Sequence, residues 1–492
     1  MWVLPLSLVG LLVFLAFLGG VFFASLVSVS IFVVWFLSAT GVVFLVLSSS
    51  HRRAIITVGL CLLVFAGGIL RMTWVESSRL DLEAVLGTAR SFQGEIVELP
   101  DINGAVTRYV IKTKDLGSEE ITILITTRRF PEFHRGEWVI TTGKLEALPE
   151  ADFPDYAMSL KRRGIQAVSP FPKMALVDPQ PPSFLRKLDA VKNRFEISIR
   201  NALPEPDAGF VLGVILGERQ SLGDDLRTAL QRTGTTHIVA LSGFNITIIA
   251  LAVGWLIGFL HLSPRIRMVV SIIVIILFVI LVGGGASIVR AAVMGFLVLL
   301  SRERGRVYQM TNALFFAAAV MVALNPYLLR FDLSFQLSFL ATLGIILAPP
   351  RLELFASWIP AAFGIREIIV GTLSAEIFVL PLILWQFGMF SFVGPLVNLL
   401  ILPVIPWLML VGAIVGGIGL ISLPLSALAG YAAHIMVAYV LGSIYWFSGW
   451  NVAAAALPQI LALVFSLPAL GIILLASRAY LKRIVGVVPA LS

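Results

Sequence analysis

A histidine, a serine and an asparagine lie close together in a strongly apolar stretch of this 492-residue chain, at His237, Ser242 and Asn245. Polar side chains at membrane depth are costly and usually face a cavity or a partner helix, so they indicate a functional site. Ser242 could act as the nucleophile of a membrane-embedded serine hydrolase if a base lay beside it. His237 and the distant His434 are the available bases, but no spacing places either one beside the hydroxyl.

Gly243 follows the serine directly and gives this stretch a second interpretation. A glycine lets two helices approach closely, so a Ser-Gly pair is also what close packing in a membrane requires. The sequence has no HExxH motif, no Cys/His cluster, no carboxylate pair at metal-site spacing and no GxxxxGK[ST] phosphate loop. We therefore expect no catalytic or nuclease constellation and no cofactor or metal, and we expect any ATP-driven motor to be a separate protein.

Five further polar residues interrupt later apolar runs: Arg290, Asp332, Gln336, Glu376 and Asn398. Arg290 comes shortly after three consecutive glycines, and it either faces a water-filled path or pairs with a carboxylate. The spacing of Asp332 and Gln336 predicts that they lie one turn apart on one helix face. Prolines near Glu376 and Asn398 predict broken helices, which a membrane tolerates where the backbone lines a cavity or is buried in protein. Together with the three polar residues above, these side chains predict the polar interior of a helix bundle, which favours transport or channel function over catalysis.

The composition predicts a polytopic membrane protein. Hydrophobic residues make up 58% of the chain, charged residues only 13%, and the mean hydropathy is +0.96. A water-soluble chain of this length needs far more charge to cover its surface. The single cysteine, Cys61, allows no intrachain disulfide and no thiolate metal cluster.

Apolar runs and basic clusters predict the membrane layout. Residues 1–75 are long and apolar enough for three N-terminal transmembrane helices. Lys and Arg gather in cytoplasmic loops, and most basic clusters of this chain fall in alternate loops, which accounts for the net charge of +8. This bias predicts a multi-pass protein of the inner (cytoplasmic) membrane in which residues 76–206 are extracytoplasmic. Residues 207–480 form a second polytopic region, and 481–492 form a short cytoplasmic tail.

The insert over residues 76–178 has the pattern of a small β domain. Four segments alternate polar residues with β-branched or aromatic ones, at 92–99, 106–113, 121–127 and 138–148. Asn103-Gly104 is a strong hairpin signal. The predicted fold is a polytopic α-helical membrane protein with an inserted small all-β (OB-like) domain, although a generic β domain with a spacer role also fits the pattern.

The insert as a whole is close to neutral, and its basic residues are concentrated in one stretch. Residues 76–206 carry 18 Lys and Arg against 19 Asp and Glu, whereas a nucleic-acid platform is normally basic throughout. Residues 161–200 are the exception, with nine basic and three acidic side chains. Apolar residues at helical spacing within 179–206 predict a basic amphipathic helix on the bilayer surface. That helix either anchors the chain to anionic lipid or steers a polyanion toward a pore.

Three blocks in the second apolar region form a recognisable set: Thr233–Asn245, Ala286–Met294, and Asn325-Pro326-Tyr327 through Phe339. In sequence, order and spacing they resemble the ComEC family of DNA-internalisation competence proteins. Gly136–Val139, Asp155–Ala157 and Gly164-Ile165 are similar to the OB-like domain of that family. The resemblance covers nearly the whole chain, in a form that lacks the C-terminal metallo-β-lactamase-like domain of many members. We therefore expect no nuclease activity.

The resemblance implies a channel for translocation of single-stranded DNA across the cytoplasmic membrane in natural transformation. The implied path comprises the polar bundle residues, namely His237, Ser242, Gly243, Asn245, Arg290, Asp332, Gln336, Glu376 and Asn398. Arg290 and His237 are the candidates for contact with phosphate. In the OB-like domain the candidates for contact with DNA are Tyr109, Arg128, Arg129 and Trp138, and burial in the domain core is the competing expectation for the aromatic ones.

The implied partners are single-stranded DNA, membrane lipids, a separate ATP-driven motor, DNA receptor proteins and, where a strand is degraded, a nuclease acting in trans. Two other functions stay open at this point. A transporter or flippase of another anionic polymer or lipid would use the same polar bundle. A membrane-embedded serine hydrolase would use Ser242 instead.

Overall fold

The computed structural model of the protein describes most of the chain. Described are residues 5–48, 53–77, 86–116, 120–150, 152–178, 183–218, 222–239, 263–303, 309–359, 364–451 and 453–456, with the single residues Asn245, Ile248, Gly258, Gly471 and Ile473. Ser242 and Gly243 of the predicted path lie outside the described residues. The chain divides into two compact units: Met1–Leu70, Phe195–Leu324 and Leu333–Ser492 form unit 1, and Arg71–Arg194 with Asn325–Asp332 form unit 2.

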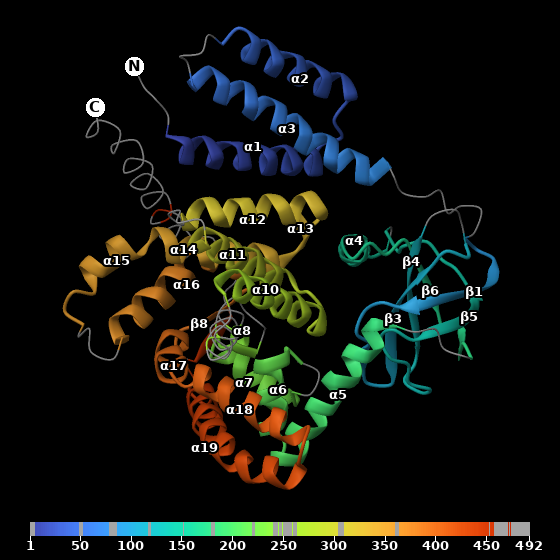
Figure 1. Cartoon of the computed structure of the whole chain (residues 1–492), viewed down its shortest axis with the longest axis vertical. Coiled ribbons are helices and arrows are strands. Elements are labelled where there is room, and N and C mark those ends of the chain that lie inside the picture. Colours follow the sequence, from blue (N-terminus) through green and yellow to red (C-terminus); the bar gives the residue numbers. More distant parts are fainter. Residues whose placement is uncertain are drawn as a thin grey trace. The chain divides into compact units, whose positions relative to one another are not determined.

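Three N-terminal helices are present where the apolar runs predict them: α1 (Leu6–Leu26), α2 (Ile31–Val46) and α3 (Arg53–Ser77) (Figure 1). Glycines let these helices pack backbone to backbone. A methyl group at Gly20 would come within 2.1 Å of the Phe65 carbonyl oxygen, and one at Gly41 within 2.9 Å of the Gly59 carbonyl oxygen. Small residues at such crossings are typical of helix association in lipid.

Four described helices are long and apolar enough to cross a membrane: α1, α3, α16 (Ile365–Phe387) and α19 (Leu423–Ser448). Two bent pairs raise this number to six if each pair is one span. They are α14 (Leu333–Leu347) with α15 (Pro349–Phe355), bent by 60°, and α17 (Gly394–Ile401) with α18 (Ile405–Gly419), bent by 51°. The chain is therefore a multi-pass membrane protein. The predicted break near Asn398 is confirmed, whereas α16 continues through Pro381, so the predicted break near Glu376 is wrong.

The main core of unit 1 surrounds a helix too short to cross a membrane. All ten residues of α6 (Asp207–Leu216) are buried, and α18 and α19 pack against it. The chain then forms α7 (Asp224–Arg232) and the single turn α8 (Thr236–Val239). Gly234 separates them with a φ of 68°, a conformation that glycine adopts without strain and that is typical of the end of a helix.

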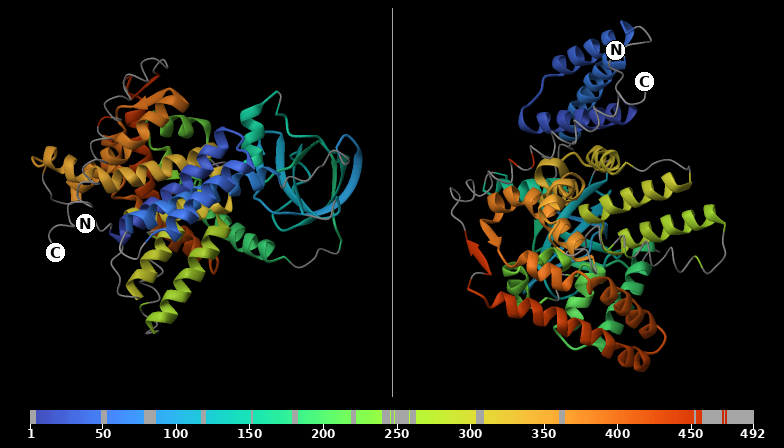
Figure 2. Two further views of the ribbon diagram at one scale, coloured as in Figure 1. Left: turned by 90° about the horizontal axis from the view of Figure 1, so that it is seen from above. Right: turned by 90° about the vertical axis from the view of Figure 1, so that its left-hand side faces the viewer.

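The next two apolar helices form a hairpin, because consecutive glycines end the first helix and let the chain turn before the second. Gly283 and Gly284 have φ values of 88° and 64° between α10 (Pro264–Leu281) and α11 (Ala286–Glu303). The two helices lie side by side (Figure 2). Helix α12 (Met310–Leu324) then packs against α1, where the Phe14 and Phe316 rings meet edge to face at 5.6 Å. Two short strands, β8 (Met389–Ser391) and β9 (Ala454–Ala456), pair antiparallel in the same unit.

Unit 2 contains a curved, mixed sheet of seven strands. These are β1 (Ala89–Ile96), β2 (Asp101–Asn103), β3 (Val106–Thr113), β4 (Ile121–Arg128), β5 (Trp138–Lys144), β6 (Ala167–Pro170) and β7 (Lys173–Leu176). The strand order is β6-β4-β3-β1-β5-β7, β2 pairs with β3, and β6 runs parallel to β4. A bridge from Glu146, just after β5, to Val168 connects the far side of the sheet back to β6, the strand at one end of this order. The predicted hairpin at Asn103-Gly104 is confirmed, because Asn103 pairs with Val106.

The expectation of an all-β insert is wrong. Helix α4 (Pro154–Arg162) lies between β5 and β6, and its Leu160 packs with Val110 and Leu124 of the sheet. The helix has only nine residues, which is shorter than the roughly 11 to 18 residues over which helical periodicity is read from a sequence. The helix starts at Pro154, and proline is favoured at the first position of a helix.

Helix α5 (Phe184–Ala202) occupies the region predicted to be a basic amphipathic helix. Near its start, Asp189 accepts two hydrogen bonds from Arg135, one of them from Nε at 2.9 Å, and both side chains are buried. Breaking a fully buried pair of this kind costs about 3–5 kcal/mol, so this contact strongly holds α5 to the sheet domain. Farther along, the Phe195 ring covers Gly416 of α18, where an added methyl group would come within 2.2 Å of it. This half of the predicted apolar stripe is thus covered by protein, while Val191 is exposed.

The predicted helix through Asp332 and Gln336 is interrupted. Asp332 has extended backbone, with φ −108° and ψ 101°, between the single turn α13 (Leu328–Phe331) and α14. Since Asp332 precedes α14 and Gln336 lies within it, the two residues do not share one continuous helix face, and that prediction is wrong.

Candidate functional site

Arg290 ties α11 to α14. Its Nη1 donates to the Ser338 carbonyl oxygen and to Thr342 Oγ1, and its guanidinium lies 5.7 Å from the centre of the Phe339 ring. The residue is only 7% exposed, and its Nε is buried without a hydrogen-bond partner among the described residues. The expected carboxylate partner of Arg290 is not found among the described residues, where its partners are a carbonyl and a hydroxyl.

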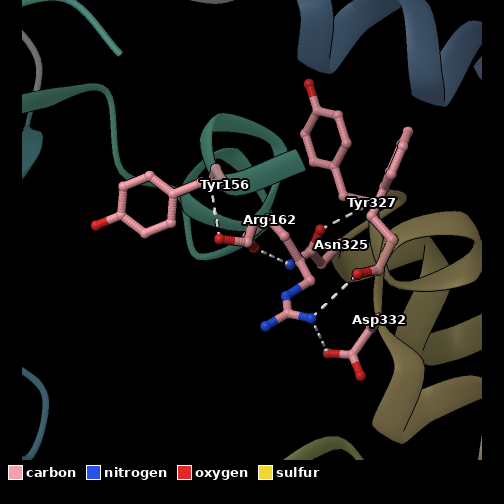
Figure 3. A network of polar contacts seen from close by, with 7 residues as sticks. Tyr156, Arg162, Asn325, Tyr327 and Asp332 are labelled. Carbon is pink, nitrogen blue, oxygen red and sulfur yellow. Dashed lines mark hydrogen bonds and ion pairs between the residues drawn. The ribbon is translucent and has the colours of Figure 1, made fainter. Parts of the chain in front are cut away.

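Asp332 belongs to a polar network in unit 2 that sequence spacing does not reveal. The carboxylate lies 3.2 Å from Nη1 of Arg162 at the end of α4, and the same nitrogen donates to the Phe331 carbonyl oxygen at 3.1 Å (Figure 3). In return, Asn325 Nδ2 donates to the Arg162 carbonyl oxygen at 2.7 Å, and the Tyr327 main-chain N–H donates to Asn325 Oδ1 at 3.2 Å. The segment Asn325–Asp332 is therefore fixed to α4 at both of its ends.

Glu376 and Asn398 lie near the start of α17 together with the turn between α7 and α8. A methyl group at Gly394 would meet Glu376 Oε1 at 3.4 Å and the Thr233 carbonyl oxygen at the same distance. Asn398 follows one turn later on α17 and is 3% exposed. His237 lies on α8, with its Nδ1 3.1 Å from the Gly234 carbonyl oxygen and its side chain exposed.

The other predicted path residues lie apart from this group. Asn245 is buried, and its Nδ2 donates to the Val214 carbonyl oxygen of α6 at 2.8 Å. Gln336 is half-buried in the first turns of α14. The described contacts thus bring Glu376 to the turn that precedes His237 and to the helix that carries Asn398, while Arg290, Asp332 and Asn245 each have partners elsewhere.

Sequence reasoning also missed a buried acidic residue at the start of α6. Asp207 Oδ2 lies 2.5 Å from Nδ1 of His434 on α19, and its side chain is 9% exposed. His434, considered above as a base for Ser242, therefore already has a carboxylate partner. An acidic residue directly before the apolar run at Phe210–Leu216 is the signal that could have pointed to Asp207.

In unit 2 the aromatic candidates for DNA contact are largely core residues. Tyr109 is 1% exposed, its hydroxyl accepts a hydrogen bond from the Phe133 main-chain N–H at 3.1 Å, and burial raises the pKa of Tyr109 above its usual value. Phe133 is buried and lies edge to face with Tyr109, and Trp138 is half-buried. The competing expectation of burial is thus confirmed for Tyr109.

Arg128 and Arg129 are exposed at the end of β4, beside two exposed phenylalanines. The Arg129 guanidinium lies 5.5 Å from the centre of the Phe130 ring, and Phe130 is 71% exposed. Phe171, in the turn between β6 and β7, donates its main-chain N–H to the Thr126 carbonyl oxygen at 2.7 Å, which places it beside the end of β4. We call Arg128, Arg129, Phe130 and Phe171 the turn surface.

Phe171 has an unusual conformation within the turn surface. Its φ of 48° lies in the left-handed region, which is strained for a bulky residue, and yet its side chain is 61% exposed. Because the ring is exposed, the strained backbone does not serve to bury it in the core, and this points to a functional role. The sequence alone gave no sign of this residue.

Comparison with known proteins gives one family and one relative. The family described as Competence protein matches residues 214–481, which is more than half of the chain. ComE operon protein 3 of Bacillus subtilis (strain 168) is 26% identical over 356 residues, or 70% of this chain and 43% of that protein. The chain thus spans less than half the length of this relative. No solved structure matches it.

Proposed function

Since the chain belongs to the competence protein family, we propose that it is a channel that carries single-stranded DNA across the cytoplasmic membrane in natural transformation. The observation that carries this proposal is the bundle within the matched region, where Glu376 of α16 and the turn before His237 lie against α17, which carries Asn398 and is half of a broken helix pair. Discontinuous helices bearing polar groups are how membrane proteins build paths for charged cargo.

The proposal places unit 2 outside the cytoplasm, where it meets the incoming strand. The alternating basic loops support this orientation. The bridge between Glu146, just after β5, and Val168 of β6, together with β6 parallel to β4, supports an OB-like domain that also contains helix α4. A separate ATP-driven motor and DNA receptor proteins complete the proposed machinery, together with a nuclease in trans where the second strand is degraded.

The turn surface is the proposed contact of this domain with DNA. Sequence-blind binding of single strands combines aromatic rings, on which bases stack, with cations that follow the phosphates. Phe130 and Phe171 supply exposed rings, and Arg128 and Arg129 supply the cations. Arg128 and Arg129 keep the role expected from the sequence, whereas buried Tyr109 is replaced as the stacking residue by Phe171.

Replacing Phe171 with Ala should weaken binding of a fluorescein-labelled oligo(dT) to the purified full-length protein. Stacking contributes about 1–3 kcal/mol per base, which corresponds to a loss of roughly 5- to 150-fold in affinity. Fluorescence anisotropy at fixed salt measures this loss. Phe153→Ala is the matched control, because Phe153 is 64% exposed in the same unit but lies outside the turn surface.

Equal affinities for wild type, Phe171→Ala and Phe153→Ala would remove the turn surface from the proposal. Loss of binding in both variants would indicate a general effect on the domain and would count against stacking at Phe171.

A further inference from the structure

Three oxygen atoms from three different elements converge on Gly394, the first residue of α17. A methyl group at this position would lie 3.4 Å from Glu376 Oε1 on α16, 3.4 Å from the carbonyl oxygen of Thr233 and 3.5 Å from Ser391 Oγ on β8. Because Gly394 has no side chain, its own atoms do not occupy the space between these three oxygens. Glu376, which the sequence predicts to be part of a DNA path, is thus one of three oxygen-bearing groups around a single glycine.

The convergent oxygens have lone pairs left for a ligand. Ser391 Oγ donates its proton to the Arg232 carbonyl oxygen at 2.9 Å, so its lone pairs are free to accept. Thr233 is the C-terminal cap of α7, and the carbonyl end of a helix carries partial negative charge. Its side chain is held by hydrogen bonds to the Ala229 carbonyl oxygen and Thr235 Oγ1, both at 2.8 Å, which fixes the residue.

Asn398 supplies a second, independent sign that a ligand belongs here. It lies one turn after Gly394, on the same side of α17, and it is 3% exposed. Its Oδ1 is buried and has no hydrogen-bond partner among the described residues. A buried acceptor without a donor costs about 1–3 kcal/mol, so its retention calls for an explanation.

Glu376 lacks a positive partner within the described part of the chain, where no Lys, Arg or His lies within 4.0 Å of its carboxylate. The donor set is therefore one carboxylate with carbonyl, hydroxyl and amide oxygens. Hard cations prefer such oxygen ligands, and a single negative charge matches a single positive one. Helix-terminal carbonyls in broken membrane helices coordinate sodium ions in this way.

We propose that Glu376, the Thr233 carbonyl, Ser391 and Asn398 form a binding site for a monovalent alkali cation, with sodium as the probe. The site goes beyond DNA passage and would stand even if the cargo were different. A bound cation would join α16, the end of α7, β8 and α17, four elements that meet at Gly394.

Thermal unfolding of the purified full-length protein tests the site. Sodium chloride should raise the melting temperature of the wild type saturably, by about 2–5 °C, relative to choline chloride at the same ionic strength. Glu376→Gln should abolish this rise. Gly394→Ala should weaken the apparent sodium affinity at least tenfold, because its methyl group occupies the space among the oxygens at ordinary contact distance and so is compatible with folding.

Glu367→Gln is the matched control, because Glu367 is an exposed carboxylate in the first turn of the same helix. It should respond to sodium as the wild type does. An identical sodium response in wild type and Gly394→Ala would overturn the proposal. Stabilisation of the wild type by lower pH but not by sodium would also overturn it and identify Glu376 as a proton acceptor instead.

Discussion

Replacing Arg290 with Gln should lower uptake of DNA into the cytoplasm by about 10- to 100-fold while most of the protein remains in the membrane. Hydrogen bonds to a charged group contribute roughly 1.5–3 kcal/mol, and each 1.4 kcal/mol is a factor of ten in a population. Without the guanidinium, α11 loses its contacts with the Ser338 carbonyl and Thr342 on α14. DNase-protected labelled DNA, divided by the amount of membrane-embedded protein, measures the effect.

Two further variants separate this role from a general loss of charge. Arg267→Gln makes the same chemical change at an exposed position near the start of α10 and should leave uptake unchanged. Thr342→Val removes one partner, and in that background Arg290→Gln should have a smaller effect, because contacting residues are not additive. Fully additive effects, or a loss of protein equal to the loss of uptake, would contradict the role of Arg290 as a tie between helices.

Reversing the charge of either Arg162 or Asp332 should release the segment Asn325–Asp332 from α4, and reversing both should largely restore it. The pair is 3.2 Å apart with side chains 26% and 11% exposed, so each single reversal should cost about 2–3 kcal/mol, below the roughly 3–5 kcal/mol of fully buried pairs. Amide hydrogen exchange of Leu328–Asp332 in the full-length protein reports the release.

The double variant, Arg162→Glu with Asp332→Arg, is the critical comparison. It should regain at least half of the lost protection, because the ion pair is re-formed in the opposite sense. Arg108→Glu serves as the matched control, since its pair with Asp101 is 3.6 Å apart and exposed on both sides. Protection that stays low in the double variant would show that the segment does not depend on this ion pair.

Local sequence patterns predicted the helices and strands of this protein better than the tertiary contacts between them. The strands at 106–113 and 121–128 follow from alternation and the hairpin at Asn103-Gly104 from its turn residues, and both signals act between near neighbours in sequence. Helix α4 was missed because its nine residues are too few to establish a helical period in the sequence.

The sequence indicated which types of residue form the candidate site, but not which of them contact one another. Asn325 and Arg162 are 163 residues apart, and Asp207 and His434 are 227 apart, so no spacing rule connects them. Burial also could not be read from residue type: Tyr109 fills the sheet core, whereas Phe171 is exposed on a strained turn. Both facts are set by tertiary packing, which alternation along one strand does not specify.

The most direct test of DNA passage is to measure DNA at the cell surface and in the cytoplasm, in cells with and without this protein. Competent cells receive labelled duplex DNA, and the label bound at the surface is measured separately from single-stranded label that reaches the cytoplasm. Without the protein, surface binding should stay normal and the cytoplasmic strand should be absent. Cytoplasmic single strands at the normal level in cells that lack the protein would contradict the proposed channel.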